Sequence, residues 1–110
     1  ITGPTVENFE KSICDYTGAE ACASIGSGTN ALTCALKALD IGQGHQVMTV
    51  GHTFVSTTES IVNVGATPVF VDIDEFYHLD ISKMQLSDTL KAILFVDLYG
   101  QTPDIDKNLI

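Results

Sequence analysis

Apolar residues along the chain recur at two different spacings, which predict alternating helices and strands. Helical spacing predicts a first helix that follows Pro4 and ends at Gly18, because glycine suits a helix terminus. The apolar stripe of this helix is formed by Val6, Phe9, Ile13 and Cys14. The remaining pattern predicts helices over Thr29–Asp40 and Val55–Val64, a weak helix over Ser82–Leu90, and strands over Ala21–Ile25, Gln46–Val50, Thr67–Val71 and Lys91–Asp97. The last residues, Asn108–Ile110, lie inside a further helical pattern.

Strands that alternate with helices are typical of an α/β domain with a mostly parallel sheet and helices on both faces. The apolar run Lys91–Asp97 is continuous, as expected of a strand buried on both faces. In such sheets, ligands bind beyond the carboxyl ends of the strands. Polar segments follow three of the predicted strands, at Ser27–Thr29, His52–Phe54 and Asp97–Gln101. We therefore expect these three segments to share one cleft.

The glycine-rich turn Gly26-Ser27-Gly28-Thr29 is the most informative of these segments. It joins a predicted strand to a predicted helix, and such a turn presents free backbone N–H groups and the positive end of the helix dipole. Together these groups bind anions, most often phosphate. An ordinary turn that binds nothing remains an equal alternative at this point.

Three kinds of phosphate site share this outline. The P-loop is excluded, because it needs a lysine after the turn and none is present. The segment Gly26–Ala31 fits the dinucleotide pattern G-x-G-x-x-A, but Gln46–His52 lacks the acidic residue expected about 20 positions further on. A single phosphate monoester, such as that of pyridoxal phosphate, requires only the turn, a hydroxyl group and the helix terminus.

Composition narrows the class of protein. A length of 110 residues, with 45% hydrophobic and 17% charged residues, is typical of one globular domain. The net charge is −9 and the five basic residues, all lysines, are not clustered, so we expect no nucleic-acid partner. No signal peptide or membrane-spanning stretch is present, and we expect no membrane partner.

Cysteine and acidic residues set two further expectations. The three cysteines contain no C-x-x-C pair, which indicates buried free thiols in the cytoplasm and no zinc site. The acidic residues gather in Asp72–Glu75 and Asp80. We interpret them as a solvated loop after a strand, with a divalent metal site as the less favoured alternative.

Taken in order, these segments resemble the DegT/DnrJ/EryC1/StrS family of sugar aminotransferases. The resemblance covers nearly the whole chain with compatible spacing, and only the ordered set is specific. The matching segments are Gly3-Pro4 with Phe9-Glu10, Ser27–Leu32, His52–Thr57, Gly65–Asp72 and Leu98–Gln101. The chain departs from the family pattern at Gly51, where proline is common, and at Asp97, where histidine is often found.

The resemblance implies the large-domain fold of the aspartate aminotransferase type (fold type I) and the cofactor pyridoxal 5′-phosphate. It implies transfer of an amino group from glutamate or glutamine to a nucleotide-linked keto sugar, in amino-sugar and polysaccharide biosynthesis, by a homodimer. By resemblance, Gly28 and Thr29 hold the cofactor phosphate, Phe54 stacks on the pyridine ring, and Ser27 lies close enough to touch the cofactor. Helix capping is an alternative for Ser27, and core burial is one for Phe54. No metal-binding or catalytic residue is assigned.

The family also joins the cofactor to a Schiff-base lysine in a Ser-Phe-x-x-x-Lys context and pairs the pyridine nitrogen with an aspartate further along. Neither segment occurs in residues 1–110. We therefore expect residues 1–110 to be a single partial domain, the N-terminal part of the large domain, and inactive alone. Two alternatives remain, a different fold type I enzyme such as a lyase or hydroxymethyltransferase, and a free-standing, non-catalytic α/β module that binds a phosphorylated ligand.

Overall fold

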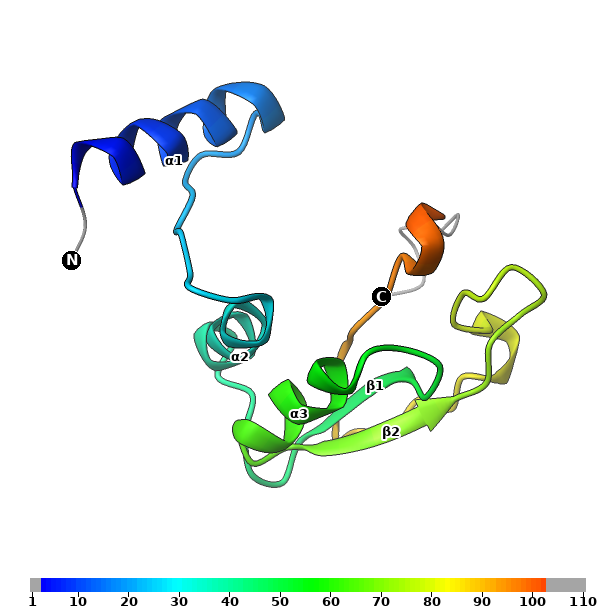
Figure 1. The fold of residues 1–110 in the computed structure, drawn as a ribbon. Helices are drawn as coiled ribbons and strands as arrows, with labels where there is room; N and C mark the ends of the chain where they lie inside the picture. Colours follow the sequence, from blue (N-terminus) through cyan, green and yellow to red (C-terminus); the bar gives the residue numbers. More distant parts are fainter. Residues whose placement is uncertain (1–2, 103–110) are drawn as a thin grey trace.

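The computed structural model describes residues 3–102, in which α-helices and strands follow one another along the chain (Figure 1). The helices are α1 (Pro4–Thr17), α2 (Gly28–Ala38) and α3 (Val55–Asn63), and the strands are β1 (Gln46–Val50), β2 (Thr67–Val71) and β3 (Leu90–Ile93). Two short 3₁₀ helices are η1 (Ile81–Lys83) and η2 (Leu98–Gly100). The helix expected near Asn108 lies outside the described residues.

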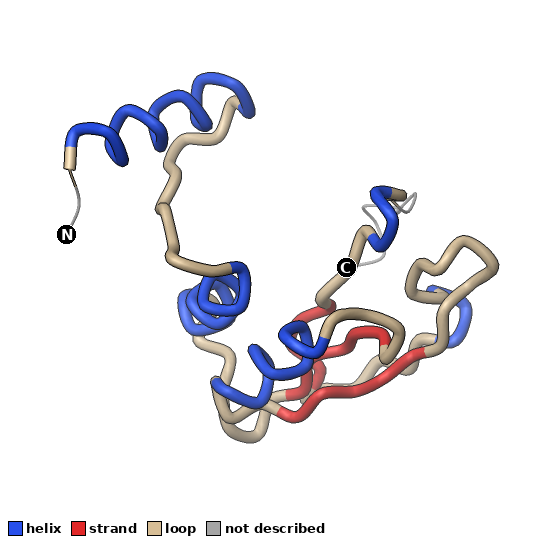
Figure 2. Tube along the Cα trace, viewed as in Figure 1, coloured by secondary structure: helices blue, strands red, loops and turns tan. Residues whose placement is uncertain are grey.

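The described strands form a parallel sheet in the order β2-β1-β3 (Figure 2). Met48 in the central strand lies opposite Val69 of β2 and Ile93 of β3. The mostly parallel α/β fold expected from the sequence is therefore confirmed. Helices were expected on both faces of the sheet. In the described residues α2 and α3 lie on one face, and the segment 72–84, which contains η1, covers the other.

Successive residues of β1 enter two different hydrophobic clusters. Val47 packs with Leu36 of α2 and Ile61 of α3 on one face. Met48 and Val50 point to the other face and pack with Leu79. This alternation is the period of two that every strand imposes on its side chains. Because β1 is buried on both faces, its carboxyl end is a fixed point from which the following loop, residues 51–54, leaves the sheet.

Three predicted elements differ from the structure. Ala21–Ile25 is extended but pairs with no strand in residues 3–102, and a strand needs a neighbour for its backbone hydrogen bonds. The strand expected over Lys91–Asp97 ends at Ile93, where its pairing with Met48 of β1 is the last of the register. No helix forms over Ser82–Leu90 beyond the 3₁₀ turn, because serine and threonine side chains here bond elsewhere. Ser87 Oγ and Thr89 Oγ1 donate to Gln46 Oε1 at 3.1 and 3.0 Å.

Helix α1 stands apart from the sheet at the end of an extended segment, and none of its residues is buried (Figure 1). Gly18 ends the helix as predicted, with φ of 76° and an N–H that donates to Cys14 O. Glu10 Oε1 accepts a hydrogen bond of 2.7 Å from Ser24 N, which ties the extended segment back to the helix.

The three cysteines are free thiols, as predicted, but none is buried. Cys14 and Cys22 are half-buried and Cys34 is exposed, because α1, the extended segment and the outer side of α2 do not pack into the two clusters. Over residues 3–102, the helices are too short or too polar to cross a membrane.

Candidate functional site

The N-terminus of α2 has the geometry of an anion site. Ser27 caps the helix, because its Oγ accepts from Asn30 N at 3.2 Å and its carbonyl oxygen accepts from Ala31 N at 2.9 Å. These bonds leave the N–H groups of Gly28 and Thr29 without a partner within residues 3–102. Two free N–H groups at the positive end of the helix dipole are suited to phosphate oxygens. Ser27 thus acts as a helix cap, which was the alternative to its contact with the cofactor.

Gly28 and Thr29 are accessible for such a contact. A Cβ at Gly28 would meet no atom within 4 Å, so the backbone there is open to an incoming group. Thr29 is half-buried, and its hydroxyl makes no hydrogen bond to the rest of the described chain. The side chain of Thr33, one turn further along, instead bonds the helix backbone at Thr29 O.

An open cavity of about 630 Å³ between α2 and α3 joins the N-terminus of α2 to Phe54. This volume lies within the range of sites for small molecules. The lining residues are Gly28, Thr29, Ala31, Leu32, Ala35, Phe54, Ser56 and Thr57. Three of the four residues predicted to bind the cofactor thus line one cavity, and the fourth, Ser27, caps the helix that forms it.

Phe54 stands at the start of α3 with its ring largely in solvent. Phe54 is 73% exposed, although phenylalanine is usually buried. Thr57 N donates to Phe54 O at 3.0 Å, so the backbone of Phe54 is fixed by the first turn of the helix. Within residues 3–102, Phe54 is not part of either hydrophobic cluster. An exposed aromatic face at a cavity wall is suited to stacking on a flat ring.

The loop 51–54 also contacts the third polar segment. A second, smaller pocket is lined by Gly51, His52, Thr53, Leu98 and Tyr99. The three polar segments therefore line two pockets, both of which include residues of this loop, instead of the single cleft expected. Asp97 lines neither pocket, and its Oδ2 accepts a hydrogen bond of 3.1 Å from Thr102.

The acidic residues after β2 organise the backbone. Asp74 Oδ1 accepts N–H bonds from Phe76 and His78 at 2.8 and 2.9 Å. Asp80 Oδ1 caps η1 by accepting from Ser82 N at 3.0 Å. It also accepts from Ser82 Oγ at 2.6 Å, and this second bond lowers the pKa of the Asp80 carboxyl. No group of three or more His, Cys, Asp or Glu side chains in residues 3–102 could hold a metal ion.

Lys83 pairs with two of these carboxylates. Its Nζ lies 3.3 Å from Asp72 Oδ2 and 3.5 Å from Asp80 Oδ2, and the hydrogen bond to Asp72 raises the pKa of the lysine.

Sequence reasoning missed Tyr77, whose ring stacks on His52 with centroids 5.5 Å apart. The stretch that contains it was interpreted only as a solvated acidic loop. The sequence signals only a turn here, because Asp74, a turn-forming residue, lies between the apolar Ile73 and Leu79. It gives no signal that Tyr77 stacks on His52.

Comparison with known proteins adds to this geometry. A model of the DegT/DnrJ/EryC1/StrS aminotransferase family matches residues 1–109. UDP-2-acetamido-2-deoxy-3-oxo-D-glucuronate aminotransferase of Pseudomonas aeruginosa is 43% identical over 109 residues, which cover 96% of this chain and 30% of that protein. The dTDP-3-amino-3,4,6-trideoxy-alpha-D-glucose transaminase of Micromonospora megalomicea is 41% identical over 96% of this chain and 29% of its own length.

A solved structure shares the arrangement of the elements. The crystal structure of NtdA from Bacillus subtilis with bound cofactor PMP superposes with a TM-score of 0.90 at 31% sequence identity. The match covers 94% of this chain and 24% of that chain. The fold described above is therefore that of one part of a larger known fold, and the chain spans less than a third of the length of the curated relatives it matches.

Proposed function

Because the chain belongs to the DegT/DnrJ/EryC1/StrS aminotransferase family, we propose that it is the N-terminal part of a pyridoxal-phosphate-dependent nucleotide-sugar aminotransferase. The matched relatives are aminotransferases, and this chain spans 30% and 29% of the lengths of two of them. Residues 1–110 would then form one partial domain, and the remaining residues needed for catalysis would come from outside it.

The observation that carries this proposal is the cavity that joins the N-terminus of α2 to the ring of Phe54. The donor set fits a phosphate-bearing cofactor. The N–H groups of Gly28 and Thr29 and the hydroxyl of Thr29 would hold the phosphate, and Phe54 would cover one face of the pyridine ring. When bound, pyridoxal phosphate supplies the electron sink that amino-group transfer requires. The role of residues 1–110 is to bind and orient it.

The substrates and assembly follow from the same family assignment. We propose glutamate or glutamine as the amino donor and a nucleotide-linked keto sugar as the acceptor, supported by relatives named for UDP- and dTDP-linked sugars. We also propose a homodimer in the cytoplasm. Support comes from the free thiols and from large apolar side chains that the described residues leave exposed, including Phe9, Tyr16 and Leu39.

A turnover assay on two proteins tests the proposal. One is the chain of 110 residues, and the other is a longer protein in which the same chain is followed by a Ser-Phe-x-x-x-Lys segment. Each is incubated with pyridoxal phosphate, glutamate and a UDP- or dTDP-linked keto sugar, and 2-oxoglutarate is followed. We expect turnover from the longer protein and none above a protein-free control from the chain of 110 residues. Steady turnover by the chain of 110 residues, or no turnover by the longer protein, would contradict the proposal.

A further inference from the structure

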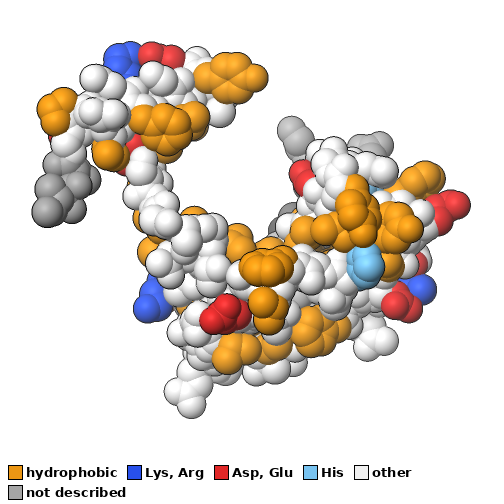
Figure 3. Space-filling model, viewed as in Figure 1, with side chains coloured by type: hydrophobic (Ala, Val, Ile, Leu, Met, Phe, Trp, Pro, Cys, Tyr) orange, Lys and Arg blue, Asp and Glu red, His pale blue; other side chains and the backbone are white. Residues whose placement is uncertain are grey.

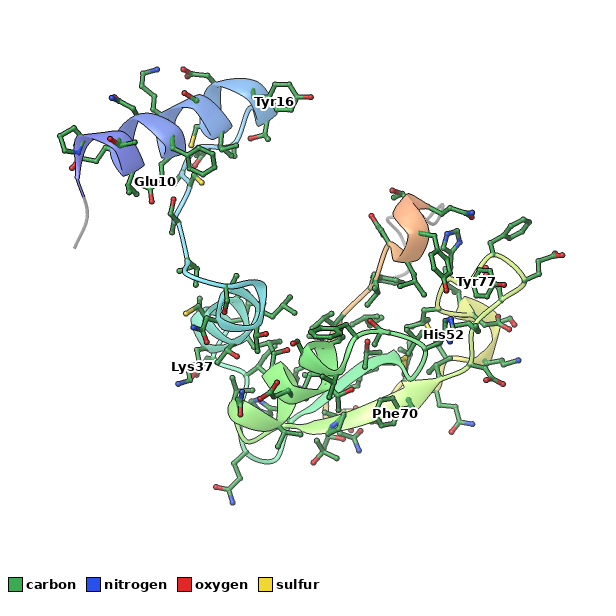
Figure 4. All side chains as sticks on the ribbon, in the orientation of Figure 1. Glu10, Tyr16, Lys37, His52, Phe70 and Tyr77 are labelled. Atoms are coloured by element: carbon green, nitrogen blue, oxygen red, sulfur yellow. The ribbon has the colours of Figure 1, made fainter. Side chains whose placement is uncertain are left out.

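Three aromatic side chains from three different segments meet near loop 51–54, and Figure 4 shows two of them, His52 and Tyr77, side by side. His52 follows β1, Tyr77 follows β2 and Tyr99 follows β3. The rings of His52 and Tyr77 are stacked, with centroids 5.5 Å apart and planes at 24°. The rings of Tyr77 and Tyr99 meet edge to face, with centroids 5.2 Å apart and planes at 83°. Both arrangements are preferred by aromatic pairs, and Tyr77 is the member that contacts both partners.

A hairpin closed by Asp74 holds Tyr77 in place. Besides the two N–H bonds that Asp74 Oδ1 accepts, its backbone N–H donates to His78 O at 2.8 Å. Ile73 and Leu79 form an antiparallel bridge at the base of the hairpin. Leu79 is only 4% exposed and packs against β1 in the second hydrophobic cluster. The hairpin is therefore anchored in the core beneath the sheet.

The backbone of two of these aromatic residues is unusual. Tyr77 and Tyr99 have φ of 66° and 60°, in the left-handed region that bulky L-residues rarely adopt. Such a conformation persists only where the surrounding structure enforces it, and it is concentrated at functional sites. The two strained backbones bring the two tyrosine rings together.

The loop 51–54 depends on this cluster for its position. Its hydrogen bonds are local, since Thr53 N donates to Gly51 O and the hydroxyls of Thr53 and Thr57 lie 3.1 Å apart. Within residues 3–102, the stack of His52 on Tyr77 is the one hydrogen bond or ring contact that joins this loop to a distant residue. The bond from Thr57 N holds the backbone of Phe54, at the end of the loop, but its side chain is too exposed for packing to hold the ring.

The same cluster is visible on the molecular surface. In Figure 3, a histidine side chain lies among hydrophobic side chains on the face shown, at the place where Figure 4 labels His52 beside Tyr77. His52 is exposed and Tyr77 is 44% exposed, so the stack lies at the surface of the molecule.

We propose that Tyr77 is a positioning residue. It holds His52, and through His52 the loop 51–54, so that the ring of Phe54 is placed to stack on the pyridine ring of the cofactor. This inference rests on the proposed function, because the ring of Phe54 matters only if a flat cofactor binds beside it. Tyr77 touches neither the cavity nor the N-terminus of α2, and it acts only through His52.

The test uses the longer protein and measures the Kd for pyridoxal phosphate by absorbance, together with circular dichroism in the absorption band of the bound cofactor. Tyr77→Ala should raise the Kd about three- to tenfold and reduce the dichroism. Tyr77→Phe keeps the ring and should stay within about twofold of the parent. Phe76→Ala, which removes the neighbouring ring on the same hairpin, is the matched control and should bind like the parent.

A double variant separates positioning from general damage. Because Tyr77 acts through Phe54, the combination of Phe54→Ala with Tyr77→Ala should bind no more weakly than Phe54→Ala alone. If Tyr77→Ala does not fold, as judged by far-ultraviolet circular dichroism, His52→Ala removes the same stack from an exposed position and should give the same increase in Kd.

Two results overturn the inference and leave the proposed function intact. In one, Phe54→Ala weakens binding while Tyr77→Ala and His52→Ala bind like the parent. In the other, the effects of Phe54→Ala and Tyr77→Ala add in full. A parent protein that does not bind pyridoxal phosphate overturns the proposed function itself, and this inference with it.

Discussion

The hydroxyl of Thr49, in the central strand β1, donates to the carbonyl oxygen of Leu94 at a distance of 2.9 Å. Thr49 is completely buried. The N–H of Leu94 in turn donates to Met48 O at 2.8 Å, one residue after β3 ends. These two bonds extend the contact between β1 and the chain after β3. They fix the edge of the sheet from which the loops that carry His52 and Tyr99 depart.

Thr49→Val is expected to destabilise the protein by about 1–3 kcal/mol, because it leaves the carbonyl of the half-buried Leu94 without its hydroxyl donor at nearly constant side-chain volume. Urea unfolding measures the change. Thr58→Val is the matched control, since Thr58 is half-buried in α3 and its side chain makes no hydrogen bond within residues 3–102. Its effect should stay within about 0.5 kcal/mol. Equal effects of the two substitutions would mean that the Thr49 bond adds nothing.

Thr29→Ala should lower the affinity of the longer protein for pyridoxal phosphate about ten- to a hundredfold. It removes one hydroxyl donor to a charged group, which contributes about 1.5–3 kcal/mol, and leaves the backbone N–H groups in place. Thr33→Ala removes a hydroxyl that bonds only the helix backbone, and it should bind like the parent. The measurement is titration of the dialysed protein by absorbance. Unchanged affinity in Thr29→Ala would show that this hydroxyl does not bind the cofactor.

Gly51→Pro, the substitution toward the family pattern, should leave cofactor affinity within about twofold of the parent. The backbone of Gly51 is not left-handed, a Cβ there would meet no atom within 4 Å, and its N–H has no acceptor in the described chain. A proline at a compatible position stabilises the folded protein by about 0.4–1 kcal/mol through the unfolded chain. Thermal unfolding and the same absorbance titration check both expectations. A clear loss of stability would show that loop 51–54 needs a backbone that proline cannot adopt.

Stability at acid pH should depend on Asp80. The bonds from Ser82 hold the pKa of this carboxyl below its ordinary value, so the carboxylate stabilises the folded state above the pKa of the unfolded chain. This contribution is lost as the pH falls from about 4 through the lowered pKa. The urea midpoint of the parent should therefore fall more steeply with acid than that of Asp80→Asn, which does not titrate. Parallel curves for the two proteins would contradict the role of the Asp80 cap.

Local patterns predicted the parts of the molecule that local physics determines. Helix α2 and its anion-binding turn follow from a serine cap, two glycines and an apolar period, and the structure places them within two residues of the expected bounds. β1 and β2 were predicted at their observed bounds, because an apolar run between turns leaves few alternatives.

Long-range partners explain what the sequence could not predict. Ala21–Ile25 has the pattern of a strand, yet nothing in residues 3–102 pairs with it, so pattern alone overestimated its structure. The stack of Tyr77 on His52 joins residues 25 positions apart. It depends on a left-handed tyrosine in a hairpin that the carboxylate and the backbone of Asp74 close. Propensities give no signal for such a conformation, since they disfavour it.

The central claim is that the N-terminus of α2 and Phe54 hold pyridoxal phosphate, and a crystal structure of the longer protein with this cofactor tests it most directly. The account predicts phosphate oxygens at about 3 Å from the N–H groups of Gly28 and Thr29 and from the Thr29 hydroxyl, with the ring of Phe54 stacked on the pyridine ring. A cofactor bound elsewhere, with the N-terminus of α2 left open to solvent, would contradict it.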